Sequence, residues 1–211
     1  MSNIKIHGHV MSTCTRRVAT VCNELGLKYE IVTVDITKGA NKAPDYTESM
    51  HPFGLVPVLE DTDGTKIYES RAIARYLVVK YGKDSGLIPP TSDVKAYGLF
   101  EQAASIEYSA FDPFAGGLAR ERIYYPMIGA PTTEVLANHY ETTLKAKFEG
   151  YDRILAKQKY LAGEHITLAD LFHLPYGSWL DRIDPGLIGS KPNLKRWWND
   201  VSSRESWKVL N

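Results

Sequence analysis

Two short segments of the chain carry residues whose types and spacing could bind a small anion. In the run His51–Leu59, Val56 and Pro57 stand at the start of a predicted strand. Only X-Pro bonds adopt the cis form at low cost, so this step is a candidate cis peptide. Glu69 and Ser70 follow at the start of a predicted helix, where free first-turn amides and a serine hydroxyl can hold a carboxylate. Together the segments predict a carboxylate site beside a cis-proline loop.

The elements that must position these residues alternate over the first eighty positions. Period-two apolar patterns predict strands, and apolar stripes with helical spacing predict helices. Asp61–Gly64 predicts a hairpin turn, and the stretch around Lys38–Lys42 is predicted to be a loose connection. The predicted strands are Ile4–Gly8, Tyr29–Asp35, Val56–Leu59 and Lys66–Tyr68, and the predicted helices are Thr15–Leu27 and Ser70–Tyr81. The resulting order, βαβ-ββα, is typical of a thioredoxin-like domain.

The composition changes after Tyr81, and no strand pattern of similar strength follows. Gly, Ser and a Pro-Pro pair between Gly82 and Pro90 predict a linker. Thr167 and Asp170 have capping-box spacing and are predicted to nucleate the helical core. Helical patterns cover Asp93–Leu118, with a bend near Pro113, and Thr133–Gln158, capped by Thr132 or Thr133, and others begin at Thr167 and Pro192. The predicted fold class is α/β plus all-α, with a thioredoxin-like domain at 1–82, a linker at 83–91 and an all-helical domain at 92–211.

Composition and charge narrow the possible partners. The 211 residues are 44% hydrophobic, with 25 basic and 25 acidic side chains. This balance argues against nucleic acid or an anionic membrane surface as partner, and no apolar run has the length of a membrane span. Cys14 and Cys22 lie ~12 Å apart along one predicted helix, too far to bridge. Without a signal-peptide pattern at the N-terminus, we expect a reducing, cytoplasmic location.

Four segments in this order and spacing resemble a cytosolic glutathione transferase, and most closely the phi class of plants and fungi. They are Gly8–Val18, Pro52–Pro57, Glu69–Ile73 and Lys159–Glu164. The resemblance covers the whole chain. It implies a homodimeric detoxification enzyme that joins glutathione, a co-substrate rather than a permanently bound cofactor, to small hydrophobic electrophiles.

The resemblance assigns the catalytic role to Ser12. Glutathione must react as its thiolate, and a free thiol with a pKa of about 8.5 is only slightly ionised at neutral pH. Ser12 precedes a predicted helix, so its hydroxyl and the helix N-terminus could both stabilise the sulfur anion. The alternative is that Ser12 only caps the helix, and Thr13 and Thr15 are nearby rivals that more often serve as caps or neighbour contacts.

Cys14 suggests a different chemistry. Ser12 to Thr15 occupy the place where thioredoxin-like redox enzymes carry Cys-x-x-Cys, but the first position here is not cysteine. Cys14 could still form a mixed disulfide with glutathione, or it could be an inert packed thiol. A glutathione-dependent thiol transferase or peroxidase, and a non-catalytic carrier of glutathione and hydrophobic ligands, therefore remain alternative functions.

The resemblance also implies which residues bind glutathione. Glu69 and Ser70 would receive its glutamyl end, although the same pair could be an ordinary N-cap. Val56, next to Pro57, would pair its backbone with the cysteinyl unit. Two positions depart from the phi pattern, since Asn41 replaces a common His and Leu55 replaces a common Gln, which puts the affinity for glutathione in doubt. The predicted set is Ser12, Asn41, Lys42, Leu55, Val56, Pro57, Glu69 and Ser70, with Lys42 either binding the glycyl carboxylate or remaining a solvated loop charge.

The second substrate and the partner subunit are predicted from the same resemblance. Phe53 is expected to enter an apolar pocket of the other subunit of a dimer. Scattered His7, His9 and His51 lack metal-ligand spacing, so no metal is expected. The candidates for the electrophile pocket, each of which could instead be core packing, are Met11, Thr13, Tyr108, Phe111, Phe114, Leu118 and Trp179.

Overall fold

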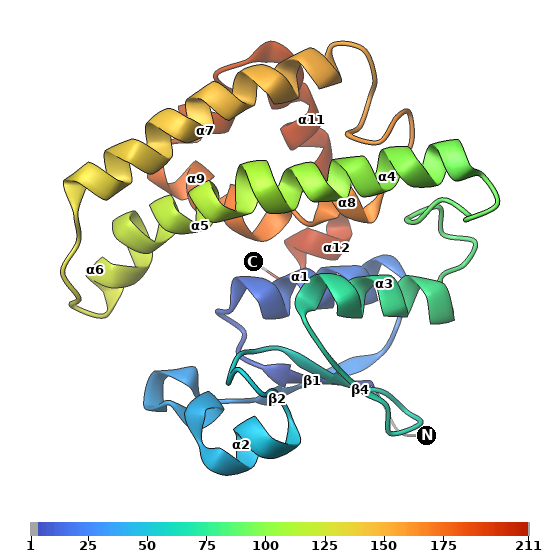
Figure 1. The fold of residues 1–211 in the computed structure, drawn as a ribbon, viewed down its shortest axis with the longest axis vertical. Coiled ribbons are helices and arrows are strands. Elements are labelled where there is room, and N and C mark those ends of the chain that lie inside the picture. The colour runs from blue at the N-terminus through green and yellow to red at the C-terminus, as the bar shows by residue number, and fades with distance from the viewer. Residues whose placement is uncertain (1–3, 211) are drawn as a thin grey trace. The chain divides into compact units, whose positions relative to one another are not determined.

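The computed structural model describes residues 4–210, which form two compact units (Figure 1). The first unit contains the residues up to Ser85 together with the segment from Glu205 onward, and the second runs from Gly86 to Arg204. The domain boundaries at 82 and 92 stay a prediction. Among residues 4–210, no helix combines the length and the apolar character that crossing a membrane requires.

A four-stranded mixed sheet forms the centre of the first unit. Its strands are β1 (Ile4–Gly8), β2 (Tyr29–Thr33), β3 (Val58–Glu60) and β4 (Lys66–Tyr68). They lie in the order β2-β1-β3-β4, with β1 parallel to β2 and the other two pairs antiparallel. Ile6 of β1 stands opposite both Ile31 and Leu59, which aligns apolar residues across the sheet. Strand β3 begins after Pro57 rather than at Val56, because proline has no N–H to donate to a ladder.

Helices cover both faces of this sheet. The helices of the first unit are α1 (Thr13–Glu24), α2 (Pro44–Ser49), α3 (Ser70–Tyr81) and α12 (Glu205–Lys208). Figure 1 shows α1 and α3 on one side of the sheet and α2 on the other. Helix α1 begins two residues before the predicted Thr15, because Ser12 caps it, and it ends ahead of Gly26, whose φ is +63°. The arrangement is thioredoxin-like, as the sequence predicted.

The connection between β2 and β3 is more ordered than predicted. The prediction of a loose stretch around Lys38–Lys42 was wrong. The segment contains two 3₁₀ turns, Ile36–Lys38 and Ala40–Lys42, and helix α2 follows them. The Asp35 side chain caps the first turn by accepting from the Thr37 and Lys38 amides. These elements are too short for the periodicity by which longer helices are recognised.

A hydrogen-bonded cluster fixes the β3–β4 hairpin to α3. Asp61 accepts from the Tyr76 and Tyr81 hydroxyls at 2.5 Å each and from the Lys80 ammonium at 2.6 Å. Burial alone would raise the pKa of the Asp61 carboxyl, but these donors outweigh it and lower the pKa to about 2. Lys80 also pairs with Asp63 in the turn at 2.6 Å. The hairpin leads directly into Glu69 and Ser70, so this cluster helps to position the start of α3.

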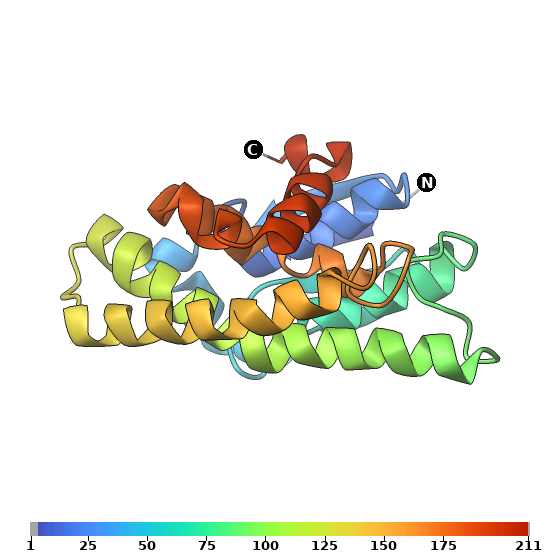
Figure 2. The ribbon, with the colours of Figure 1, turned by 90° about the horizontal axis from the view of Figure 1, so that it is seen from above.

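The second unit is helical throughout its described secondary structure. Its helices are α4 (Val94–Ile106), α5 (Asp112–Ala119), α6 (Tyr125–Met127), α7 (Glu134–Leu155), α8 (Leu168–Leu171), α9 (Leu174–Ile183), α10 (Pro185–Gly189) and α11 (Pro192–Ser202). Figure 2 shows α7 running alongside the stretch from α4 to α6, and α5 packs directly against α7. The fold of this unit confirms the predicted all-helical C-terminal part.

Two details of these helices differ from the predictions. The single helix expected over Asp93–Leu118 is interrupted by a π-helical turn at Glu107–Phe111, and a second π turn follows at Arg120–Tyr124. Such turns insert one residue into a helix and are invisible to a 3.6-residue periodicity. Thr133 stands at the N-cap of α7 but makes no side-chain capping bond, and its amide instead donates to Glu121 at 2.8 Å.

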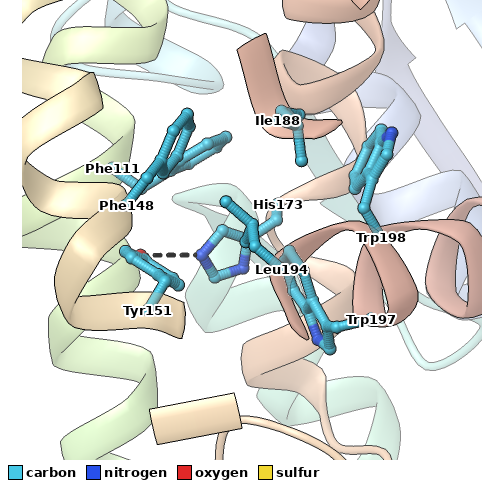
Figure 3. A pocket seen from close by; sticks show the side chains of 8 residues that line it. All are labelled: Phe111, Phe148, Tyr151, His173, Ile188, Leu194, Trp197 and Trp198. Carbon is cyan, nitrogen blue, oxygen red and sulfur yellow. Dashed lines mark hydrogen bonds between the residues drawn. The ribbon is translucent and has the colours of Figure 1, made fainter. Parts of the chain in front are cut away.

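Aromatic side chains surround the buried His173 in the core of this unit (Figure 3). Its Nδ1 lies 2.8 Å from the Ala169 carbonyl, and its Nε2 lies 3.0 Å from the Tyr151 hydroxyl. A carbonyl only accepts, so Nδ1–H donates and Nε2 accepts from the tyrosine. Burial raises the pKa of Tyr151 well above its ordinary value. The aromatic cluster consists of His173 and the side chains that line the same small pocket, which are Phe111, Phe148, Tyr151, Ile188, Leu194, Trp197 and Trp198.

Candidate active site

Ser12 lies directly before helix α1 and caps it. Its backbone is extended, and its Oγ accepts a hydrogen bond from the Thr15 amide at 3.3 Å. The Ser12 carbonyl accepts the first helical bond, from the Arg16 amide, at 3.0 Å. A hydroxyl that accepts one bond still has its own hydrogen to donate. The half-buried Ser12 can therefore cap the helix and donate to a ligand at the same time, so the two roles are compatible.

The turn that carries Ser12 is held against α1 by Thr15. A Cβ on Gly8 would lie 2.4 Å from Thr15 Oγ1, so only glycine permits this close approach. Thr15 Oγ1 also accepts from the His9 amide at 3.3 Å, and the Ser12 amide donates to the His9 carbonyl at 2.8 Å. Thr15 is buried, as expected of a neighbour contact, whereas Thr13 is half-buried at the first position of the helix.

The loop before β3 contains the predicted cis bond, between Val56 and Pro57. The Tyr46 hydroxyl of α2 donates to the Leu55 carbonyl at 2.9 Å and so anchors this loop. Within residues 4–210, the amide and carbonyl of Val56 have no hydrogen-bond partner. An extended peptide could pair with this free backbone unit as an added strand does.

Asn41 and Lys42 both reach the same loop. The Asn41 side-chain amide donates to the Gly54 carbonyl at 2.7 Å, and the Lys42 ammonium donates to the Phe53 carbonyl at 3.1 Å. Gly54 has a φ of +60°, and a Cβ there would lie 2.6 Å from the Asn41 carbonyl, so glycine is required. The two side chains therefore brace the loop, while the exposed Lys42 stays accessible to a carboxylate.

The start of α3 combines a strained backbone with first-turn amides that precede the first helical hydrogen bond. Among residues 4–210, Glu69 is the only non-glycine residue with a positive φ, at +71°. Such a conformation costs on the order of 1–3 kcal/mol and persists at binding sites where surrounding structure enforces it. Glu69 makes no capping bond with its side chain, and the first helical bond runs from the Ile73 amide to the Glu69 carbonyl. The amides before Ile73 therefore lack intrahelical acceptors and can bind an anion.

Arg17 is a residue of this site that was not predicted from the sequence. It lies on α1, is only 1% exposed, and donates from a terminal nitrogen to Ser70 Oγ at 2.9 Å. The same nitrogen lies 3.5 Å from Cys14 Sγ. The sequence does indicate a special role for Arg17, because an arginine beside Val18 on the buried face of a helix needs a polar partner.

Family models match most of this chain, and a curated relative matches nearly its whole length. Residues 11–78 match the model of the glutathione S-transferase N-terminal domain, and residues 119–205 match that of the C-terminal domain. Glutathione S-transferase PM239X14 of Arabidopsis thaliana is 59% identical over 198 residues, which cover 94% of this chain and 91% of the relative. This chain belongs to the glutathione S-transferase family.

Solved structures refine the place of this glutathione S-transferase within the family. Glutathione transferase F2 of Populus trichocarpa has a TM-score of 0.90 at 33% identity and covers 98% of this chain and 96% of its own. Glutathione S-transferase I from maize, solved in complex with an atrazine glutathione conjugate, has a TM-score of 0.90 at 28% identity and covers 99% of this chain and 96% of its own. The chain is of the phi type, in agreement with the resemblance of its four sequence segments.

The predicted electrophile-pocket residues of this glutathione S-transferase differ in accessibility. In the first unit, Met11 is exposed and Thr13 is half-buried. In the second unit, Tyr108 is 64% exposed and Phe114 is half-buried. The remaining three candidates, which are buried in the helical core, are Phe111, Leu118 and Trp179. Phe111 belongs to the aromatic cluster of Figure 3, so it takes part in core packing.

The histidines and cysteines have ordinary environments in this transferase. In the described part of the chain, no group of three His, Cys, Asp or Glu side chains could hold a metal ion. His7 lies 3.1 Å from Glu60, and the buried His51 packs against the Tyr68 ring at 4.7 Å between centroids. Both cysteines are free thiols, and burial raises the pKa of Cys22 to about 12, which makes it unreactive.

Proposed function

We propose that this member of the family joins the thiolate of glutathione to small hydrophobic electrophiles. The observation that carries the proposal is the arrangement of Ser12 and Ser70, each at the N-terminus of a helix, in a chain that belongs to the glutathione S-transferase family. The maize glutathione S-transferase I was solved with a glutathione conjugate of atrazine as its ligand, and this supports the same chemistry here.

The peptide is held along the first unit in this proposal. Ser70 and the first amides of α3 receive the glutamyl carboxylate, and Glu69 binds the adjacent ammonium. The unpaired backbone of Val56, between Leu55 and Pro57, pairs with the cysteinyl unit. Asn41 and Lys42 lie at the loop that would meet the glycyl end. This assignment gives each charged group of the tripeptide a partner of complementary charge or hydrogen-bonding character.

Ser12 then acts on the sulfur of the bound peptide. Its hydroxyl donates to the thiolate, and the N-terminus of α1 adds partial positive charge. Lowering the pKa of the thiol by ~2 units requires roughly 2.7 kcal/mol of preferential thiolate stabilisation. A hydrogen bond to a charged group contributes about 1.5–3 kcal/mol, so Ser12 can supply a large part of this.

The electrophile in this proposal is apolar and reacts with the thiolate that Ser12 stabilises. Met11 and Thr13 flank Ser12 in sequence, and Tyr108 and Phe114 are the candidates of the second unit with accessible side chains. Phe111, Leu118 and Trp179, which are buried in the helical core, complete the proposed set of apolar residues. Detoxification in the cytoplasm is the setting we propose for this reaction.

The reaction class is tested by comparing two substrates. We expect the purified protein to conjugate glutathione to a chromogenic aryl halide, and we expect Cys14→Ser to keep at least half of this activity because the proposed reaction gives Cys14 no role. A mixed disulfide of glutathione serves as the second substrate. Activity confined to the disulfide and lost in Cys14→Ser would establish a thiol transferase instead, and glutathione binding with neither activity would indicate a carrier.

Phe53 provides a separate prediction about assembly. Its ring is 70% exposed, a large apolar side chain on a loop braced by Asn41 and Lys42. We propose that it inserts into a pocket of a second copy, where loss of a buried aromatic ring costs about 2 kcal/mol or more. Phe53→Ala should therefore shift a homodimer toward monomer at low protein concentration in light scattering. Val135→Ala, which removes another exposed apolar side chain, is the control, and an unchanged mass for Phe53→Ala would contradict the proposal.

A further inference from the structure

We propose that Arg17 is a positioning residue for glutathione, holding Ser70 so that the Ser70 hydroxyl donates to the glutamyl carboxylate. The inference rests on the proposed function, because it assumes that this carboxylate binds at the start of α3. Arg17 itself need not touch the peptide. It acts through the hydrogen bond of 2.9 Å from its guanidinium to Ser70 Oγ.

The direction of this hydrogen bond determines what Ser70 can do. A guanidinium has only donors, so the Ser70 oxygen must accept from Arg17. One lone pair of the hydroxyl is then occupied and its rotation is restricted, while its hydrogen remains available for an acceptor. A carboxylate is the acceptor that such a hydroxyl binds most strongly. Arg17 therefore turns Ser70 into an oriented donor.

Burial strengthens this effect. Arg17 is 1% exposed and Ser70 is 5% exposed, so water screens the guanidinium charge only weakly. The guanidinium contacts Ser70, the first residue of α3, and the dipole of this helix also favours an anion at its N-terminus. Arg17 thus adds a positive charge to the carboxylate site from α1, the helix that Ser12 caps. One side chain connects the helix of the proposed catalytic serine with the serine that binds the peptide.

The neighbouring Arg16 provides a matched comparison. It lies on the same helix but stacks over the Trp207 ring, 4.5 Å from its centroid, and donates to the Leu210 carbonyl at 3.1 Å. Replacing Arg16 therefore removes an arginine with extensive packing and leaves the bond between Arg17 and Ser70 in place. A general loss of stability or of helix α1 packing should appear in both variants, whereas a loss of carboxylate binding should appear only for Arg17.

The experiment measures the affinity for glutathione by calorimetry and kcat by steady-state kinetics. The proteins compared are wild type, Arg17→Met, Arg17→Lys, Arg16→Met, Ser70→Ala and the double variant Arg17→Met/Ser70→Ala. We expect Arg17→Met to weaken glutathione binding about tenfold, as loss of a charge-assisted bond predicts, with kcat changed less than twofold. The effect should shrink to less than twofold in the Ser70→Ala background. Arg17→Lys, which keeps the charge but not the planar donor group, should fall between wild type and Arg17→Met.

A second ligand shows whether Arg17 positions Ser70 for the carboxylate or only stabilises the fold. In 4-aminobutyryl-cysteinylglycine the glutamyl α-carboxylate is absent, so this peptide should bind wild type and Arg17→Met equally. Equal weakening of both peptides, or the same loss in Arg16→Met, would overturn the inference. If circular dichroism shows that Arg17→Met does not fold, the same comparison is made with Arg17→Lys. Failure of wild type to bind glutathione would instead contradict the proposed function itself.

Discussion

Replacing Ser12 with alanine should lower kcat/KM for conjugation about 10- to 100-fold. The substitution removes the hydroxyl proposed to donate to the glutathione thiolate, and a hydrogen bond to a charged group contributes about 1.5–3 kcal/mol. Each 1.4 kcal/mol corresponds to a factor of about ten. The affinity for glutathione should change little, because the peptide contacts of Val56, Glu69 and Ser70 remain. Steady-state kinetics with a chromogenic electrophile measures both quantities.

Two further variants separate this role from helix capping. Ser12 Oγ accepts from the Thr15 amide, so alanine also removes a cap that contributes ~1 kcal/mol to stability. Ser12→Gly removes the hydroxyl but costs only a few tenths of a kcal/mol as a cap. Both variants should lose activity equally while their thermal stabilities differ, and Thr13→Ala, which removes the adjacent hydroxyl, should stay within threefold of wild type. Undiminished conjugation in Ser12→Gly would rule out the proposed role.

Replacing Asp170 with alanine should produce the largest loss of stability, about 3 kcal/mol or more. The buried carboxylate accepts from the Leu161 amide at 3.0 Å, the Thr167 amide at 2.9 Å, the Thr167 hydroxyl at 3.2 Å and the Trp197 indole at 2.9 Å. It therefore completes the capping box of α8 and joins this helix to two other segments. Alanine leaves all four donors buried without an acceptor, and each orphaned group costs about 1–3 kcal/mol.

Asp93 is the matched control for this prediction. It also caps a helix, accepting from the Ala96 amide at 3.0 Å, but it lies at the surface of α4. Asp93→Ala should therefore cost only about 1 kcal/mol, since water can replace the lost acceptor. Urea unfolding followed by tryptophan fluorescence compares the two variants. Equal destabilisation would show that Asp170 is an ordinary cap and does not organise the helical core.

The sequence predicted the order of elements and the segments of the candidate site, because both depend on local patterns. Period-two strands, the Val-Pro step and the Glu-Ser pair are visible without any tertiary information. The family resemblance followed from the order and spacing of four such segments, and the relatives confirm it.

Features that depend on tertiary contacts were missed. The 3₁₀ turns and α2 contain too few residues to show a period, and the π turn at Glu107–Phe111 alters a helix without breaking its apolar pattern. The partner of Arg17 could not be predicted from local patterns, because Ser70 lies 53 residues away in sequence. The roles of Phe111 and Leu118 stay a prediction, since an apolar residue on a helix has the same sequence pattern whether it lines a pocket or packs in a core.

The central claim is that the protein binds glutathione and ionises its thiol. The most direct measurement is a pH titration of the thiolate absorbance of glutathione bound to wild type and to Ser12→Gly. The account predicts a thiol pKa about two units below the free value of about 8.5 in wild type, and a return of at least one unit toward that value in Ser12→Gly. A bound thiol that titrates like free glutathione, or that titrates identically in the two proteins, would contradict it.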